Sequence, residues 1–591
     1  MKPLRGLLGS VLALTSAAVL FWPSAAGAVP PDPCAPILPL DDVSAGMLGT
    51  GWTVSEGTDP ESFDVEVLGI APSLVGPGRD IIIAEISGPL VDRGGGVWAG
   101  MSGSPIYVDE DADTIADDLI GALAYGFSFG PNNVVGLTPA EHMERILGYP
   151  AASFRTKAFP ARVKLPRAVA KMVARKTRTP MPAVGGSLIR LKLPVSVSGL
   201  APQRMNRVKK LLRRQGVAAI PYAGSAVSLA SVGSIDEFHP GDNFAGALSY
   251  GDVTLAGIGT TTYVCDGQAL AFGHPFLFGG RTTLGASGAD AITIVADPTL
   301  TPFKLANVEG IAGTVDQDRL AGIRAVDGLP ETIPVSTAVT SLDTLNARTG
   351  QTDVVLKSAF PGLASSHLLA NLDVVFDEIG EGSSNVTFAV TGTRADGSTW
   401  RLQRQNLFTS DFDISFESIL ELENALFEIA NNPFEKVEFT GVQATASVED
   451  TVREYTLTDV LVCAAGRCRD RRMVSASPGE TIDLLATLTP SDGSEPELVE
   501  LALRIPRGMR FGGEIEITGG AGDCFEGECG PAGEPDSFGE LLRSLRRAPT
   551  NNVLTASLRS FSGRVRDKDE AVLDRVVRGS EFISVDLGGG L

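Results

Sequence analysis

Apolar and β-branched residues recur in short stretches near the N-terminus and predict a β-rich unit over residues 29–150. FDVEVLGI at 63–70 and DIIIAEIS at 80–87 have the composition of strands. LIGALAYGFSFG at 119–130 predicts a further strand or a hairpin. In TPAEHMERIL, residues 138–147, a Thr is followed three residues later by a Glu, and this capping pattern predicts the start of a helix.

The β pattern returns after residue 185. Residues 185–345 predict a second β-rich unit, and residues 346–460 continue the alternation of apolar and polar positions. One helix interrupts the second unit at 202–216, PQRMNRVKKLLRRQG, where apolar residues share one face and a Gly ends the pattern.

The last part of the chain divides into two regions. Residues 461–530 contain alternating stretches such as TIDLLATLTP and predict a β-sandwich-like module. Residues 531–591 are more polar, and SFGELLRSLRRA at 537–548 predicts a helix within them.

Composition narrows the class of protein. A chain of 591 residues with 43% hydrophobic and 20% charged residues is globular and long enough for two to four domains. Its 67 glycines and 37 prolines favour β structure with many turns. The net charge of -22 repels nucleic acids, which argues against a DNA- or RNA-binding function.

The first 28 residues have the features of a secretory signal. Lys2 and Arg5 precede a mostly apolar stretch at 11–22, and Ala26-Gly27-Ala28 is a small-x-small cleavage site. The apolar stretch is short for a membrane anchor. We therefore expect export to the periplasm, the cell surface or the medium, with no integral membrane segment after cleavage.

Six cysteines remain after cleavage, and an exported protein is expected to pair them. Cys463 and Cys468 form one close pair, and Cys524 and Cys529 form another, so we expect a disulfide within each. The alternative is a zinc site, but no His lies near either pair and the spacing is unusual for zinc. Cys34 and Cys265 are the remaining pair.

Residues 151–184 differ in charge from their surroundings. Residues 155–180 carry nine Lys and Arg and no acidic residue. A solvated basic linker is the expected structure. A patch that binds a membrane or polyanion and a proteolytic processing site are the alternatives.

The string WAGMSGSPIY at 98–107 is a candidate nucleophile loop. Its Gly-rich context exposes a serine in a tight turn, although a simple hairpin turn would have the same composition. An α/β-hydrolase elbow needs a helix after the Ser, whereas PIYV continues as a strand. In a β-barrel serine peptidase, the N–H groups of Gly100 and Ser102 would face the developing oxyanion.

A serine nucleophile needs a base, and the chain offers four histidines. His142 belongs to the helix expected at 138–147, at a surface position. His239 lies in a turn, and His367 lies in SSHLLANL, in a helix or at a strand edge. His274, in ALAFGHPFLFGG, follows an apolar strand and stands between Gly and Pro, which makes it the candidate base.

Two segments together resemble one known family. GVWAGMSGSPIYVDEDADTIADDLIGALAYGF is similar to the Ser-bearing segment of the SpoIVB peptidase family, the S55 serine peptidases, and GIGTTTYVCDGQALAFGHPF is similar to its His-bearing segment. With their flanks they cover residues 36–150 and 240–315. The resemblance implies a chymotrypsin-like double β-barrel with Ser102 as nucleophile and His274 as general base. Ser104 matches a second serine that is not the nucleophile.

The chain departs from the founding members in three respects. Ser102 precedes His274, which predicts permuted halves, the Ser-bearing half at 29–150 and the His-bearing half at 185–345. The founding members' acid has no clear counterpart, and Asp92 and Asp290 are the candidates. No PDZ domain is found. Permutation leaves a triad intact because geometry defines it, so the Ser102 hydroxyl is expected within about 3–4 Å of a His274 nitrogen.

The sequence therefore predicts an exported serine endopeptidase that acts on protein or peptide substrates. The alternative is a catalytically inactive peptidase-like scaffold that binds partners in the envelope or outside the cell. No cofactor or metal is expected, because the chain has neither His-x-x-Glu-His nor a phosphate-binding Gly-Lys-Ser/Thr loop. The sequence makes no prediction of oligomeric state.

Overall fold

The protein is mainly β, as its sequence patterns predict. The computed structural model describes residues 32–110, 116–127, 133–150, 162–178, 180–181, 186–229, 233–296, 301–464, 467–509, 511–520 and 535–587. Strands account for 50% of the structure and helices for 17%. The predicted signal peptide lies outside the described residues, as do Cys524 and Cys529. Within the described ranges no helix has both the length and the apolar character to cross a membrane.

Six N-terminal strands form a closed antiparallel barrel. The pairing runs β4-β1-β2-β3-β6-β5, and β5 pairs back with β4 to close the ring. The strands are β1 (Leu48–Thr53), β2 (Glu61–Ala71), β3 (Ile81–Ser87), β4 (Pro105–Val108), β5 (Asp118–Phe127) and β6 (Val134–Pro139). Apolar side chains of these strands form one buried cluster, which holds the barrel together by removing apolar surface from water.

Two short helices flank this first barrel, α1 (Pro89–Gly94) and α2 (Ala140–Glu144). The helix expected at 138–147 is present, but its predicted Thr cap is wrong. Thr138 is part of β6, and its hydroxyl donates to the Gly273 carbonyl at 2.5 Å instead of capping α2. The capping pattern failed because a tertiary partner competes for the hydroxyl.

The basic segment 151–184 is structured where it is described, which corrects the expected linker. β7 (Arg162–Lys164) pairs with β8 (Ser187–Arg190), and β8 extends the first barrel by pairing with β5. Between them lies α3 (Arg167–Lys176), whose Val169, Ala170 and Val173 are buried against the barrel. Because these three residues lie on one helical face, the helix packs while its basic residues remain exposed.

A 13-stranded sheet occupies the centre of the chain. The pairing runs β10-β9-β12-β13-β16-β15-β14-β11-β18-β17-β21-β19-β20, and β11 also pairs with β12. This extra pairing makes β12, β13, β16, β15, β14 and β11 a ring of antiparallel neighbours. The strands of the ring are β11 (Asn243–Gly251), β12 (Thr254–Cys265), β13 (Gln268–Ala271), β14 (Gly280–Val295), β15 (Phe303–Arg319) and β16 (Gly322–Val326).

The remaining strands of this sheet lie on either side of the ring. They are β9 (Leu193–Ser198), β10 (Ala219–Ala223), β17 (Ile333–Ser341), β18 (Ala347–Val354), β19 (Gly382–Arg394), β20 (Thr399–Ser410) and β21 (Val437–Glu449). The helices that accompany the sheet are α4 (Met205–Arg214), α5 (Phe360–Phe376), α6 (Ile414–Glu417) and α7 (Leu420–Ala430). The helix predicted at 202–216 is confirmed as α4. Almost every residue of α5 is buried, as its lack of a polar face requires.

Two five-stranded sheets at the C-terminus pack around one apolar cluster and form a sandwich. One sheet contains β22 (Glu454–Ala464), β23 (Arg467–Asp470), β25 (Thr481–Pro490), β26 (Glu497–Arg504) and β30 (Val576–Arg578). The other contains β24 (Met473–Ser475), β27 (Gly513–Gly519), β28 (Val553–Ser560), β29 (Val565–Val572) and β31 (Ser580–Asp586). The sandwich is therefore larger than the module expected at 461–530, because strands of the polar region 531–591 complete it.

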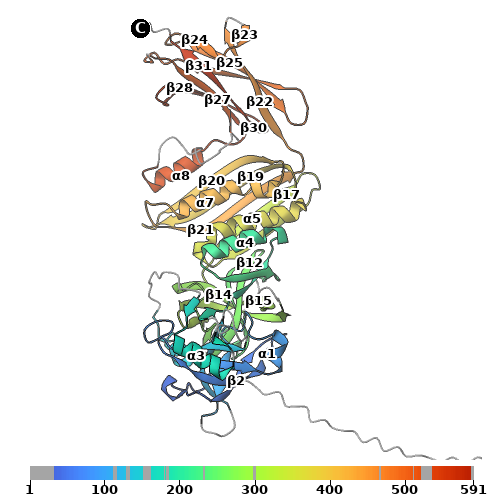
Figure 1. Cartoon of the computed structure of the whole chain (residues 1–591). Coiled ribbons are helices and arrows are strands. Elements are labelled where there is room, and N and C mark those ends of the chain that lie inside the picture. Colours follow the sequence, from blue (N-terminus) through green and yellow to red (C-terminus); the bar gives the residue numbers. More distant parts are fainter. Residues whose placement is uncertain are drawn as a thin grey trace, which may run out of the picture.

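The elements follow one another along an elongated molecule. Figure 1 shows β2, β14 and β15 at one end, the layer of β17, β19, β20 and β21 with its helices in the middle, and the sandwich strands at the other end. The helix predicted at 537–548 is confirmed as α8 (Phe538–Arg547). Phe538 packs edge-on against Trp400, with 5.6 Å between the ring centroids. Helix α8 therefore belongs to the middle layer, although it lies between sandwich strands in the sequence.

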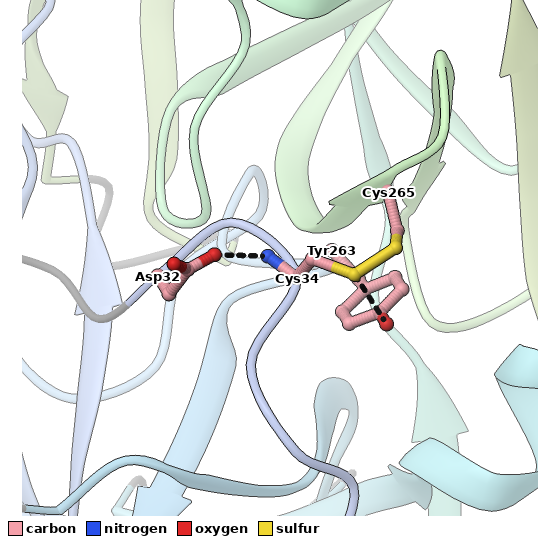
Figure 2. Close-up of a disulfide and its surroundings, with 4 residues drawn as sticks. All are labelled: Asp32, Cys34, Tyr263 and Cys265. Carbon is pink, nitrogen blue, oxygen red and sulfur yellow. Dashed lines mark hydrogen bonds between the residues drawn. A yellow bond between two sulfur atoms is a disulfide. The ribbon is translucent and has the colours of Figure 1, made fainter.

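Two disulfides join described cysteines. The Cys463–Cys468 bridge is confirmed and closes the turn between β22 and β23. Cys34 pairs with Cys265, 231 residues later, and so ties the segment before the first barrel to the end of β12. Figure 2 shows this bridge beside the Tyr263 hydroxyl, 3.3 Å from the Cys34 sulfur, with the Cys34 N–H donating to Asp32.

Candidate active site

Residues 98–104, here called the Ser loop, lie between α1 and β4. The conformation of this loop depends on two glycines. Gly100 and Gly103 have φ values of 106° and 100°, in the left-handed region that glycine tolerates best. A Cβ on Gly103 would fall 2.0 Å from the Thr260 carbonyl oxygen. The loop can therefore approach β12 only because no side chain stands at this position.

Strands of the central sheet hold the Ser loop in place. The Thr260 hydroxyl donates to the Gly100 carbonyl at 2.9 Å, and its N–H donates to the Ser102 carbonyl at 2.8 Å. Two residues beyond, the Thr262 hydroxyl donates to the Gly103 carbonyl at 2.7 Å. Three successive contacts thus fix a loop of the first barrel to β12, a strand of the ring.

His274 follows β13 through an unusual backbone turn. Phe272 and Gly273 both have positive φ, 68° and 60°, which turns the chain sharply before the histidine. The Gly273 carbonyl accepts the hydroxyl of Thr138, so the first barrel also anchors the His segment. Two reciprocal anchors therefore align the two segments.

This alignment brings the predicted pair together. The Nε2 atom of His274 lies 2.9 Å from the Ser102 Oγ, although 172 residues separate them in the sequence. The expected juxtaposition of these side chains is confirmed. Ser102 is 1% exposed and His274 is 2% exposed, so bulk water does not compete for the contact.

The partners of the ring fix its tautomer. Nδ1 lies 2.8 Å from the Pro275 carbonyl oxygen, which can only accept a hydrogen bond. A neutral ring therefore carries its proton on Nδ1, and Nε2 is left with a lone pair that accepts the Ser102 hydroxyl proton. This is the arrangement that a general base requires.

Burial lowers the pKa of His274 to about 3, and the nearby positive charge of Arg190 acts in the same direction. The Arg190 Nη1 donates a hydrogen bond to the Pro275 carbonyl oxygen at 3.2 Å, and the same oxygen accepts the hydrogen bond from His274 Nδ1. The imidazole is consequently neutral at physiological pH and available as a base.

The acid candidates from the sequence do not contact His274. Asp92 and Asp290 are both exposed, and within the described ranges no carboxylate bonds the ring nitrogens, whose partners include Ser102 and Pro275. A main-chain carbonyl takes the position that a carboxylate has in a Ser-His-Asp triad. The sequence could not reveal this substitution because every residue has a carbonyl.

Asp318 is the buried carboxylate that the sequence reasoning missed. It accepts the N–H groups of Phe276 at 2.8 Å, Leu277 at 2.6 Å and Gly279 at 3.1 Å, immediately after the histidine. Burial raises its pKa, while these hydrogen bonds oppose the rise. Asp318 thus holds the backbone turn that follows His274. It lies on β15, 41 residues after Leu277 in the sequence, so only the tertiary structure reveals this contact.

The two N–H groups proposed for the oxyanion site lie in the Ser loop. Met101, Gly103 and Ser104 donate their N–H groups to the carbonyls of Trp98, Leu123 and Met101. Among the described residues, the N–H groups of Gly100 and Ser102 have no such acceptor. An oxyanion site requires N–H donors that have no main-chain acceptor, and both residues are buried here.

Ser104 faces away from the base. Its hydroxyl donates to the Met101 carbonyl at 2.8 Å, within its own turn. Because Gly103 lets the backbone turn between the two serines, only the Ser102 hydroxyl reaches His274. The two serines thus differ in their hydrogen-bond partners.

The other three histidines lie elsewhere. His142 is buried in α2, which corrects the expected surface position, because the short helix packs against the first barrel. His239 is exposed in its turn beside Asp242. His367 is buried in α5 between the hydroxyls of Thr337 and Thr352, and burial lowers its pKa to about 4.

No protein-family model and no curated protein matches the chain. The described residues contain no cluster of three or more His, Cys, Asp or Glu side chains suited to a metal ion. Inferences about function consequently rest on the sequence motifs and on the geometry around Ser102 and His274.

Proposed function

We propose that the protein is an exported serine endopeptidase that hydrolyses peptide bonds with Ser102 as nucleophile and His274 as general base. The observation that carries the proposal is the 2.9 Å contact between Ser102 Oγ and a His274 Nε2 that bears a lone pair. The Gly100 and Ser102 N–H groups would receive the oxyanion.

The reaction follows from this arrangement. Ser102 Oγ attacks the scissile carbonyl carbon while its proton passes to His274 Nε2, and the carbonyl oxygen becomes the oxyanion. The C–N bond then breaks, and Nε2 returns the proton to the leaving amine. A water molecule attacks the acyl-enzyme and gives its proton to Nε2. The proton then passes to Ser102 as the carboxylic acid product leaves.

The fold supports a chymotrypsin-like double barrel with permuted halves. The first barrel supplies Ser102 and the antiparallel ring of β11–β16 supplies the segment of His274. The Ser and His motifs resemble those of the SpoIVB peptidase family, whose members have the same pair in the opposite order. The disulfides, together with the predicted signal, support export, because such bonds persist in oxidising compartments.

A fluorophosphonate probe on the purified mature protein tests the proposal. We expect labelling of the wild type at Ser102, identified by peptide mapping. Ser102→Ala and His274→Ala should each lower labelling by several orders of magnitude. Ser104→Ala is the matched control and should retain labelling, because its hydroxyl bonds only within the turn. An unlabelled wild type, or equal labelling of Ser102→Ala, would contradict the proposal.

A second candidate function is supported by two features of the site. The Nδ1 partner is a carbonyl, which stabilises an imidazolium less than a carboxylate would, and both side chains are almost inaccessible. These features suit an inactive peptidase-like scaffold that binds partners in the envelope or outside the cell. The same probe experiment separates the two, because the scaffold would remain unlabelled while folded.

A further inference from the structure

A buried lysine with no carboxylate partner lies against the Ser loop. Lys304, near the start of β15, is fully buried, and within the described ranges no carboxylate forms an ion pair with it. Its ammonium group donates to the Asn243 Oδ1 at 2.7 Å. Burial alone lowers the pKa of Lys304 to about 7. A buried charge of this kind is costly to the fold and calls for an explanation.

Lys304 contacts the residue that carries one of the proposed oxyanion donors. The main-chain N–H of Lys304 donates to the carbonyl of Ala99 at 2.9 Å, and Ala99 is the residue before Gly100. A Cβ built on Gly100 would fall 2.7 Å from the Lys304 Cβ and 3.5 Å from its Cε. The aliphatic stem therefore runs along the Gly100 backbone, and the ammonium group is one bond beyond the Cε atom.

Asn243 holds the ammonium group of Lys304 through its amide oxygen. Its amide nitrogen donates to the Ala289 carbonyl at 2.7 Å and to the Gly57 carbonyl at 3.3 Å, which orients its oxygen toward Lys304. Asn243 therefore links the first barrel, through Gly57, to β14. A carboxylate at the position of Asn243 would neutralise the charge of the lysine, whereas the amide holds the lysine without neutralising it.

We propose that Lys304 is a positioning residue for the oxyanion site, holding the Gly100 peptide with its stem and main chain and placing beside it an amino group whose protonated form has no carboxylate to neutralise it. This inference rests on the proposed function. The charge would favour the negative oxygen that develops in the transition state over the neutral carbonyl of the ground state. Lys304 touches no reacting atom in this role.

The test compares Lys304→Met, which keeps the stem and removes the charge, with Lys304→Arg and the wild type. We expect the rate of fluorophosphonate labelling at saturating probe to fall about 10- to 100-fold in Lys304→Met, with the probe concentration for half-maximal rate little changed. Lys304→Arg keeps the charge and should recover part of the rate. Asn243→Ser, which loosens the ammonium group, should lie between them.

Thermal unfolding separates this role from a purely structural one. Replacing a buried, unpaired charge by an apolar residue of similar length should leave the melting temperature of Lys304→Met unchanged or higher. A variant that labels as fast as the wild type overturns the inference, and so does one whose slower labelling follows a lower melting temperature. An unlabelled wild type overturns both the proposed function and this inference, whereas a labelled wild type with an equally labelled Lys304→Met overturns this inference alone.

Discussion

The N–H of Thr260 donates to the carbonyl oxygen of Ser102 at 2.8 Å, and its hydroxyl bonds the Gly100 carbonyl two residues earlier. A strand of the ring thereby holds the main chain of the candidate nucleophile from the first barrel. The first barrel and the ring of β11–β16 are consequently coupled at the atoms that determine where the Ser102 hydroxyl points.

Thr260→Val removes the hydroxyl at constant shape and should loosen the Ser loop. It leaves the buried Gly100 carbonyl without its donor, which costs about 1–3 kcal/mol of unfolding free energy. We expect slower probe labelling together with a lower urea midpoint. Thr261→Val is the matched control, because the described residues offer its buried hydroxyl no partner, so its stability should be unchanged or higher. Equal effects of the two substitutions would contradict the assigned anchor.

Gly103→Ala should disrupt the Ser loop more than any other single methyl addition in it. The new Cβ would meet the Thr260 carbonyl at 2.0 Å on a backbone with a φ of 100°, so loop and strand must separate. We expect loss of labelling with a lowered melting temperature. Gly95→Ala, at a φ of 70° with open space around the Cβ, should cost only about 1 kcal/mol and retain labelling. Full labelling of Gly103→Ala would show that the loop tolerates displacement.

Activity should persist at a lower pH than an ordinary histidine base allows. A base with the usual pKa near 6.5 is mostly protonated at pH 5. Because burial lowers the pKa of His274 to about 3, it remains neutral at that pH and can accept the Ser102 proton. The rate of probe labelling, measured from pH 8 to pH 4, should not fall with an apparent pKa near 6.5. A midpoint there would contradict the buried neutral ring.

The same shift affects stability with a definite sign. The folded pKa of His274 lies below its unfolded value, so the unfolded chain binds the extra proton. The contribution of His274 to the free energy of unfolding is complete above about pH 6.5. It is lost as the pH falls toward 3, by at most about 1.4 kcal/mol per pH unit. His367 acts in the same direction, with a folded pKa of about 4. His274→Gln should flatten the decline of melting temperature between pH 6.5 and 4.

The two disulfides should differ in their effect on stability. In the chain-entropy model, a bridge that spans 231 residues stabilises by about 5 kcal/mol, and one that spans 5 residues by about 2 kcal/mol. We therefore expect the double variant Cys34→Ser, Cys265→Ser to lower the urea midpoint more than Cys463→Ser, Cys468→Ser. Fluorescence of Trp52 and Trp98, which are buried in the first barrel, reports its unfolding. Equal shifts would contradict the expected difference.

Slower probe labelling should accompany the loss of the long bridge. Cys34–Cys265 joins the N-terminal segment to β12, the strand that also carries Thr260, so its loss removes one connection between the first barrel and the ring of β11–β16. Reduction by dithiothreitol should reproduce the effect in the wild type and leave the double variant Cys34→Ser, Cys265→Ser unaffected. Unchanged labelling after reduction would show that the remaining contacts align the first barrel and the ring without the bridge.

The sequence alone determined the β character of the chain, its candidate nucleophile and base, and the close cysteine pair. These features are local: strand composition, a Gly-rich turn around Ser102, a histidine between Gly and Pro, and two cysteines five residues apart. It also located α4 and α8, which both have an apolar face at helical spacing, and for α4 a Gly end signal.

The tertiary structure decided which groups surround that pair. The Asp318 carboxylate and the hydroxyls of Thr138 and Thr260 bond backbone groups far away in the sequence, whereas the carbonyl at Nδ1 belongs to Pro275, the residue next to His274. No side-chain pattern encodes a hydrogen bond to a carbonyl that every residue possesses. The partners of Asp318, Thr138 and Thr260 depend on how distant strands pair and pack, which no local pattern specifies. A main-chain carbonyl occupies the position for which the sequence offered Asp92 and Asp290 only as candidates.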